Sequence, residues 1–246
     1  MKPFLILQLR PNDQASDGDF QAFLKASGLK ESEVHRIRME KTGIPENIVL
    51  EEFSGVIVGG GPDNISDDED KKRDVQKSFE KQLYKLIDEI VKKDFPFMGA
   101  CYGFGALAHH QEGIVNKTNY SEPPGAVTIR LRDSAGNDDL LKELPTKFRA
   151  FVGHKESCQE LPARATWLAS SQDCPHHIFR LKKNIYATQF HPELDAEGIC
   201  LRIEIYKNAG YFPPEDAEKL KAECRKEDVT VPMQILKNFA DKYRSQ

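Results

Sequence analysis

Several features that define other protein classes are missing from this chain. Its 246 residues include five cysteines, an odd number with no Cys-x-x-Cys pair, which argues against a zinc knuckle or a disulfide framework. No apolar run approaches the roughly 20 residues that span a bilayer, and the first residues lack the pattern of a signal peptide. Lysine and arginine number 35 against 39 acidic residues, so the basic surplus that nucleic acid requires is also missing. We expect a cytosolic protein that binds neither membranes nor nucleic acids.

Length and composition favour a globular domain. Hydrophobic residues make up 39% of the chain and charged residues 30%, a balance typical of folded rather than disordered proteins. A chain of this length buries a sizeable core without disulfides or metal sites. We therefore expect a single domain over residues 1–246, with a helical C-terminal extension from about residue 196.

The first half of the chain alternates buried strands with helices. Short apolar runs at 4–9, 56–58 and 95–100 are typical of buried strands. Apolar residues recur at helical spacing from about 75 to 92, and a further helix is expected to open at Cys101. This alternation predicts an α/β fold of three layers, in which helices cover both faces of a mostly parallel central sheet.

The second half contains more strands and ends in helices. The expected strands are 126–131, 148–152, 165–169, 177–181 and 185–190. The expected helices are 196–208, 215–226 and 232–243. The charged run 67–74 is interpreted as a solvated loop that leads into the helix near residue 75.

A first chemical signal lies where the strand 95–100 meets the next helix. In Gly99-Ala100-Cys101-Tyr102-Gly103 a nucleophilic side chain is flanked by glycines two residues away on either side. A nucleophile on so sharp a turn requires small neighbours, because larger ones would clash. The helix N-terminus favours negative charge on the sulfur, and the amide of Tyr102 is placed to face an oxyanion. A buried cysteine in a glycine-rich turn is the alternative interpretation.

The second signal follows the strand 185–190. His191 comes directly after the strand end, where a loop can direct it across the edge of a parallel sheet. Glu193 lies two residues further on, close enough to fix the imidazole tautomer and to stabilise its charged form. A surface histidine beside an acidic residue fits the same pattern.

A third signal is the run Gly59-Gly60-Gly61-Pro62 after the strand 56–58. Glycines at a strand end let backbone amides approach a substrate closely. The Gly-Lys-Ser/Thr sequence of an ATP-binding phosphate loop does not follow, so this motif does not predict nucleotide binding.

Together these segments resemble the class I, triad-type glutamine amidotransferases, most closely the stand-alone members similar to GMP synthase. The resemblance is carried by Gly60-Gly61-Pro62, by the turn 99–103 and by the segment 189–193. Residues 153–156 also look like the stretch that precedes the family's histidine. The resemblance implies a flavodoxin-like three-layer α/β/α fold.

The resemblance also implies a role for each matching residue. Cys101 is the expected nucleophile, His191 the base, and Glu193 the carboxylate that orients His191. Gly61 and Tyr102 match the amide donors of the oxyanion hole. The implied reaction cleaves the γ-amide of glutamine through a γ-glutamyl thioester and releases glutamate and ammonia, with a separate synthetase or acceptor subunit as the expected partner. No cofactor and no metal are expected.

One departure from the family pattern affects substrate recognition. The family usually has His-Gln after the cysteine turn, whereas this chain has Phe104 and Gly105. The missing glutamine side chain removes a polar contact worth roughly 1–3 kcal/mol. The residues expected to line the substrate are Gly60, Gly105, Gly153 and His154. A γ-glutamyl hydrolase that acts on a bulkier conjugate, and a catalytically silent regulatory module, remain as alternatives.

The remaining histidines and cysteines are expected to be structural. His109-His110 and His176-His177 have no acid or cysteine at metal-ligand spacing. The other four cysteines lack a glycine turn and are expected to be inert and half-buried: Cys158, Cys174, Cys200 and Cys224. The segment Tyr211–Pro214 is expected to form a packed C-terminal excursion.

Overall fold

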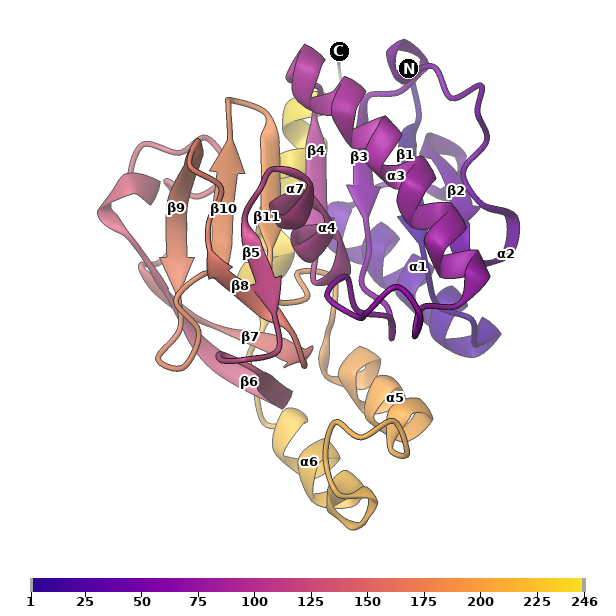
Figure 1. Cartoon of the computed structure of the whole chain (residues 1–246). Helices are drawn as coiled ribbons and strands as arrows, with labels where there is room; N and C mark the ends of the chain where they lie inside the picture. The colour runs from indigo at the N-terminus through magenta and orange to yellow at the C-terminus, as the bar shows by residue number, and fades with distance from the viewer. Residues whose placement is uncertain (1, 245–246) are drawn as a thin grey trace.

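The computed structural model describes residues 2–244, which fold around a nine-stranded sheet (Figure 1). The strands of this sheet are β1 (Phe4–Gln8), β2 (Val34–Arg38), β3 (Gly55–Val58), β4 (Phe97–Ala100), β6 (Glu122–Leu131), β7 (Lys147–His154), β9 (Ala165–Ser170), β10 (Ile178–Leu181) and β11 (Ile185–Thr188). A separate ladder pairs β5 (Ile114–Asn116) with β8 (Ser157–Glu160). The helices are α1 (Asp13–Ser27), α2 (Met39–Thr42), α3 (Asp74–Lys93), α4 (Tyr102–His110), α5 (Ala196–Tyr206), α6 (Ala217–Cys224) and α7 (Thr230–Tyr243).

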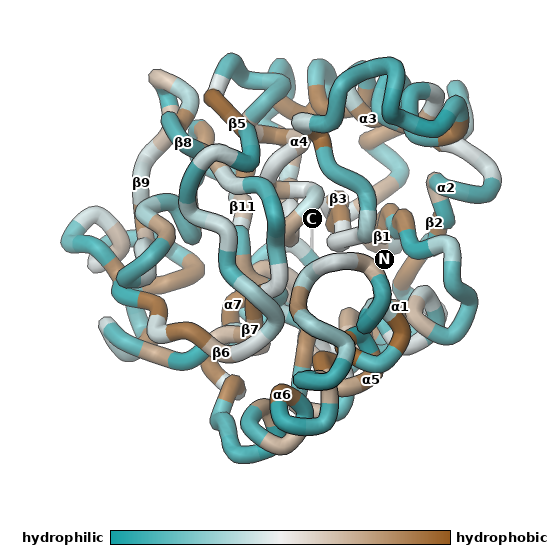
Figure 2. Tube along the Cα trace, turned by 60° about the horizontal axis from the view of Figure 1, so that its bottom comes forward, coloured by the Kyte–Doolittle hydropathy of each residue, from teal (hydrophilic) through white to brown (hydrophobic). Residues whose placement is uncertain are grey.

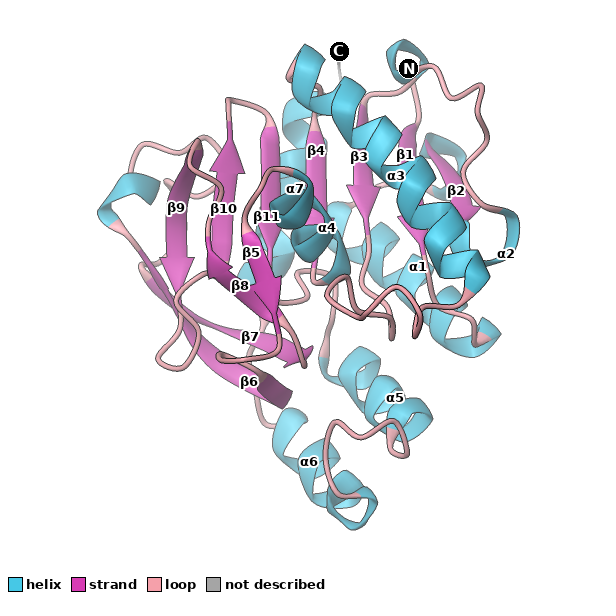
Figure 3. Cartoon of the chain, in the orientation of Figure 1, coloured by secondary structure: helices cyan, strands magenta, loops and turns pink. Residues whose placement is uncertain are grey.

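The centre of the sheet is parallel and covered on both faces. Strands β2, β1, β3, β4 and β11 lie side by side in this order and run in the same direction. Every residue of β1, β3, β4 and β11 is buried, as expected for strands with helices on both faces. Helices α3 and α4 cover one face, and α1 and α7 cover the other (Figure 3).

An antiparallel extension continues the sheet beyond β11. Strand β10 pairs with β11 and β9, and β6 pairs with β9 and β7. Hydrophobic segments concentrate in the strands and the inner faces of the helices, whereas the outer loops are hydrophilic (Figure 2). Within residues 2–244 no helix combines the length and the apolar character needed to cross a bilayer.

The register of the parallel strands brings three loops to one edge of the sheet. Val58 pairs with Gly99, and Ala100 pairs with Thr188, so β3, β4 and β11 end at about the same level. The loops that follow begin with Gly59, Cys101 and Gln189. Helices α5 and α6 lie beyond this edge (Figure 1). Segments that are far apart in the sequence thus meet at the carboxyl ends of the strands.

The sequence-based fold class is confirmed, with corrections in detail. Helix α1 and the edge strand β2 were not expected, and neither was the β5–β8 ladder. The charged run 67–74 is not fully solvated, because Lys72 is buried and its Nζ lies 2.7 Å from Oε2 of Glu80. The expectation of half-buried cysteines was also wrong, since all four are at most 4% exposed: Cys158, Cys174, Cys200 and Cys224.

Candidate active site

Cys101 occupies a strained position between β4 and α4. Its backbone has φ 52° and ψ −93°, although residues with a side chain rarely adopt positive φ. The amide of Cys101 donates to the carbonyl of Thr188 at 2.8 Å, which ties the turn to the neighbouring strand β11. Tyr102 follows as the first residue of α4, so its amide is among those that the helix itself leaves free.

Close backbone packing explains the glycines on either side of Cys101. A methyl group at Gly99 would lie 2.6 Å from the carbonyl carbon and oxygen of Gly103. A methyl group at Gly103 would lie 2.7 Å from the carbonyl oxygen of Val58. Backbone atoms cannot give way as a flexible side chain can, so the turn forms only with glycine at both positions.

His191 lies beside Cys101 and is oriented by Glu193. The amide of His191 donates to the carbonyl of Phe151 at 3.0 Å, and Nδ1 lies 2.8 Å from Oε1 of Glu193. A methyl group at Gly60 would lie 2.6 Å from Cε1 of His191 and 3.2 Å from Cβ of Cys101. The glycine loop, the cysteine turn and the histidine segment therefore converge on one point, with Nε2 of His191 left for the sulfur.

The surroundings of His191 favour its protonated form. Burial lowers the pKa of this imidazole, but the Glu193 carboxylate and the Cys101 side chain outweigh burial and raise the pKa to about 9. Glu193 is 1% exposed and only its Oε1 has a hydrogen-bond partner. An imidazolium that persists at neutral pH can balance a thiolate and can donate a proton to a leaving group.

We expect the stability of the protein to fall as the pH rises through the pKa of His191. Below about pH 6.5 the imidazole is protonated in the folded and the unfolded chain, so its stabilising contribution is complete. The folded pKa of about 9 means that this contribution, roughly 3 kcal/mol, is lost between about pH 6.5 and 9. Urea unfolding at a series of pH values should show that the free energy of unfolding falls more steeply with pH for the wild type than for His191→Gln. Parallel curves for the two proteins would contradict the assignment.

A group of buried charges, here called the Asp19 cluster, lies next to Glu193 and comprises Arg10, Asp19 and Arg202. Arg10 donates from Nε to Oδ1 of Asp19 at 3.0 Å, and Arg202 donates from Nη2 to the same oxygen at 2.6 Å. Burial raises the pKa of Asp19, but the two guanidinium groups outweigh it and hold that pKa below its usual value. With Glu193, the cluster balances two cations against two anions.

One cavity opens beside Cys101 and is called the Cys101 cavity here. It is lined by Gly61, Asp63, Asn64, Cys101, Tyr102, Gly105, Val115, Gly153, His154, Lys155, Glu156, Ser157, Gln189 and Tyr211. Five of the six residues expected to line the substrate or to hold its oxyanion are among them: Gly61, Tyr102, Gly105, Gly153 and His154. Gly60 is not among them, but it lies against His191 and Cys101 as described above.

The carboxylate of Glu156 lies next to Gly105. A methyl group at Gly105 would lie 3.5 Å from Oε1 of Glu156, whose carboxylate accepts hydrogen bonds from the amides of Ile65 and Ser66 at 2.9 and 2.8 Å. Phe104 does not face the cavity but packs in the core, 4.9 Å from the ring of Phe179. A buried carboxylate therefore borders the place where the family usually has a glutamine side chain.

His154 belongs to a buried network that fixes one wall of the Cys101 cavity. Its Nε2 lies 2.8 Å from Oε2 of Glu122, and its Nδ1 lies 2.9 Å from the carbonyl of Glu156. Glu122 also receives a hydrogen bond from Ser171 at 2.8 Å. Burial raises the pKa of Glu122, but contacts with His154 and His177 outweigh it and hold that pKa well below its usual value.

The same network corrects one expectation about His177. The sequence placed no acid at ligand spacing from His176-His177, but the fold brings Glu122 and Cys174 to His177, with ligand atoms within 4.8 Å of one another. Burial raises the pKa of the Cys174 thiol to about 12. We interpret the group as structural, because Glu122 is bonded to Ser171 and His154.

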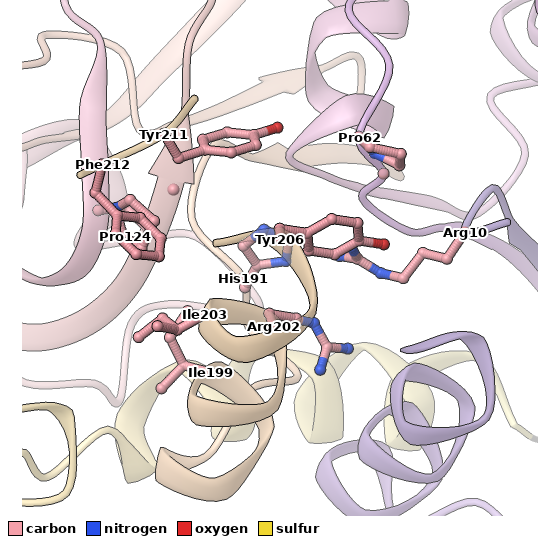
Figure 4. A pocket seen from close by; sticks show the side chains of 13 residues that line it. Arg10, Pro62, Pro124, His191, Ile199, Arg202, Ile203, Tyr206, Tyr211 and Phe212 are labelled. Atoms are coloured by element: carbon pink, nitrogen blue, oxygen red, sulfur yellow. The ribbon is translucent and has the colours of Figure 1, made fainter. Parts of the chain in front are cut away.

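A second cavity, here called the His191 cavity, lies on the other side of the site (Figure 4). It is lined by Arg10, Gly61, Pro62, Pro124, Val152, Gly153, His191, Ile199, Arg202, Ile203, Tyr206, Tyr211 and Phe212. The segment after α5 covers both cavities, because Tyr211 lines each of them. Lys155 fixes this segment by donating to the carbonyl of Ala209 at 2.6 Å, with its Nζ 4.4 Å from the centre of the Tyr211 ring.

Several residues of the site could not be predicted from local sequence patterns. The Asp19 cluster and Tyr206 come from α1, the end of β1 and α5, and none of them belongs to a recognisable motif. The available signal was a charged residue on the buried side of α1. Asp19 is next to Phe20 in the sequence and is buried together with it. Glu156 was visible only as part of the segment that resembles the family.

Comparisons with known proteins agree with this geometry. The family model for class I glutamine amidotransferases matches residues 22–198. The chain is 27% identical to a GMP synthase [glutamine-hydrolyzing] of Campylobacter lari over 204 residues, which are 76% of this chain and 36% of that protein. It is 32% identical to the corresponding enzyme of Dehalococcoides mccartyi over 140 residues, 57% of this chain and 23% of that protein. The chain thus spans about a third or less of the length of these relatives.

Solved structures give the same fold. A glutamine amidotransferase from Thermotoga maritima superposes with a TM-score of 0.78 at 23% identity and covers the whole of both chains. A glutamine amidotransferase from Methylobacillus flagellatus superposes with a TM-score of 0.73 at 19% identity, covering 100% of this chain and 95% of that chain. Because the family model spans well over half of the residues, the chain belongs to the class I glutamine amidotransferases.

Proposed function

We propose that this enzyme hydrolyses the γ-amide of glutamine with Cys101 as nucleophile, His191 as general base and acid, and Glu193 as the carboxylate that orients His191. The observation that carries the proposal is the convergence of a strained cysteine at a helix N-terminus with a buried histidine whose Nδ1 lies 2.8 Å from Glu193. The names of the GMP synthase relatives, which describe them as glutamine-hydrolysing, support the same reaction.

The proposed reaction proceeds through a covalent intermediate. The sulfur of Cys101 attacks the γ-carbonyl carbon, and the amides of Gly61 and Tyr102 stabilise the oxyanion. His191 then donates its proton to the amide nitrogen, the C–N bond breaks and ammonia leaves. Water, deprotonated by His191, attacks the γ-glutamyl thioester and releases glutamate and the free thiol.

Product analysis and covalent labelling test this proposal. Purified protein incubated with L-glutamine should release ammonia and glutamate in equal amounts. A glutamine-like electrophile should modify Cys101 and none of the four buried cysteines, which peptide mass spectrometry will reveal. Absence of glutamate release together with an unlabelled Cys101 would favour the catalytically silent alternative.

Gly60→Ala should slow turnover by about 100-fold, because a displacement of about 1 Å in a reacting group has effects of that size. The added methyl group would lie 2.6 Å from Cε1 of His191 and would push the imidazole away from Cys101. Gly125→Ala is the matched control, since its nearest neighbour would be the carbonyl oxygen of Pro123 at 4.0 Å. The measurement is kcat for glutamine. Equal kcat values for the two variants would place the reaction elsewhere.

We further propose that the ammonia passes to a separate synthetase or acceptor subunit. Two observations support this partner: the relatives are GMP synthases, and the matched region is about a third or less of their length. Affinity purification from the source cells should recover a second protein whose addition increases glutamine hydrolysis. Recovery of this chain alone would oppose the proposed assembly.

A further inference from the structure

The formal charges that line the His191 cavity have only one sign. Arg10, Arg202 and His191 line it, and no aspartate or glutamate does so among residues 2–244. Asp19 and Glu193 lie outside the lining, where both are buried and bonded to these cations. Such a space disfavours a cation, ammonium included, and attracts an anion.

Two polar groups in this cavity are placed to bind an anion. A methyl group at Gly60 would lie 3.4 Å from Nη2 of Arg10 and 2.6 Å from Cε1 of His191. The side chains of Arg10 and His191 therefore approach the same point. The hydroxyl of Tyr206 has no partner at hydrogen-bond geometry within the described part of the chain, although it lies close enough to Arg10 to help raise the pKa of that guanidinium. Figure 4 shows this hydroxyl directed toward Arg10. A buried donor without a partner is costly unless a ligand satisfies it.

The cavity lies on the side of the site where a leaving group departs. Cys101 lines the other cavity, which receives the γ-glutamyl group that becomes bonded to sulfur. His191, which protonates the departing nitrogen in the proposed function, lines this one. The two cavities share Gly61, Gly153 and Tyr211, so a substrate that spans both would carry its amine substituent into the His191 cavity.

The His191 cavity has room for a small substituent. Its volume is about 40 Å³, room for about three water molecules, against about 20 Å³ for the Cys101 cavity, and both cavities are partly open to solvent. A carboxymethyl group, four non-hydrogen atoms beyond the amide nitrogen, is of this size and carries the charge that the lining favours. Ile199, Ile203 and Phe212 close the remaining wall with apolar surface (Figure 4).

The geometry points to γ-glutamyl amides of small amino acids, with γ-glutamylglycine as the simplest case, as substrates of this enzyme, their carboxylate bound by Arg10 and Tyr206. The inference rests on the proposed function of Cys101 and His191. It adds that the amine which leaves the γ-glutamyl group is a small amino acid. Cys101 attacks the γ-carbonyl, the C–N bond breaks, and the proton of His191 goes to the nitrogen of glycine. Water then cleaves the thioester, so that the products are glutamate and glycine.

Three substrates that differ only in the leaving amine test the inference: γ-glutamylglycine, γ-glutamylethylamide and glutamine. The ethylamide keeps the two carbons of the glycine compound but lacks its two carboxylate oxygens and their charge. We expect kcat/KM for γ-glutamylglycine to exceed that for the ethylamide by about tenfold or more, as for a charge-assisted hydrogen bond. Equal values for the two, with glutamine hydrolysis intact, would overturn the inference and leave the proposed function standing. Failure to cleave any of the three would overturn both.

Two variants connect the preference to the cavity. Arg10→Met leaves Asp19 paired with Arg202 and should reduce the ratio of kcat/KM between γ-glutamylglycine and the ethylamide to about one. Tyr206→Phe removes only the unpartnered hydroxyl and should reduce the same ratio by about threefold. The ethylamide rate reports whether each variant remains folded and active. A ratio that neither substitution changes would show that the carboxylate binds elsewhere.

Discussion

Replacing Cys101 with alanine is expected to reduce glutamine hydrolysis by about 10⁴-fold or more, because the covalent route is lost. The sulfur is held on the turn between β4 and α4, and no other cysteine of the described chain is more than 4% exposed. Burial also raises the pKa of Cys158 to about 12, so this thiol remains protonated and unreactive. Release of glutamate and ammonia should be measured with the wild type and the variant side by side.

Cys101→Ser provides the sharper control for this experiment. Serine keeps the size and the hydrogen bond of the side chain, but its hydroxyl is far harder to deprotonate, so activity should remain close to that of the alanine variant. Both variants should still fold cooperatively, because the turn is built from Gly99 and Gly103 rather than from the sulfur, although they lose the part of the His191 pKa shift that Cys101 contributes. A serine variant with more than about a tenth of wild-type kcat would argue that the sulfur is not the nucleophile.

Local patterns were sufficient to predict the central sheet and the converging loops. Each of β1, β3 and β4 is a short apolar run, and Gly59, Cys101 and His191 each lie within three residues of a strand end. Because parallel strands place their carboxyl ends at one edge, the loops with Gly61, Cys101 and His191 were expected at that edge, and the strands before them end at about the same level. The information needed lay within a few residues of each motif.

The features that the sequence did not predict depend on contacts between distant segments. Helix α1 buries Ser16 and Asp19 beside its aromatic residues, so its apolar stripe is interrupted and periodicity alone is weak. Strand β2 lies at the sheet edge, and its sequence Val-His-Arg-Ile-Arg reads as a solvated segment. The partners of Asp19 are 9 and 183 residues away, so no local pattern reveals that this carboxylate is buried between two arginines.

The loop after α5 illustrates the same limit. Tyr211 and Phe212 read as part of a packed excursion in the sequence, and in the fold they line the space beside His191. Their placement follows from Lys155, which anchors the loop through the carbonyl of Ala209. This contact joins two residues separated by 54 positions, and only the folded chain shows them together.

Asp19→Asn is expected to lower the free energy of unfolding by about 3–5 kcal/mol, the cost of leaving buried charges without a partner. The substitution keeps the shape of the side chain but strands the guanidinium groups of Arg10 and Arg202, which are 4% and 5% exposed. Without the charge of Asp19, only Glu193 would offset the two guanidinium charges near His191. The raised pKa of His191 should therefore fall. Urea unfolding measures the first effect, and the pH dependence of kcat/KM measures the second.

A matched surface pair separates this effect from ordinary loss of an ion pair. Lys237 and Asp241 lie 2.6 Å apart on α7 with both side chains about half exposed, so Asp241→Asn should change the free energy of unfolding by less than about 1 kcal/mol. Adding Arg202→Met to Asp19→Asn removes one of the two stranded cations and should restore part of the lost stability. If Asp19→Asn costs no more than Asp241→Asn, the cluster is solvated in solution and cannot stabilise the ionised Glu193. If it costs several kilocalories and the second substitution restores part of them, the arginines act as the buried counterions on which the histidine's carboxylate depends.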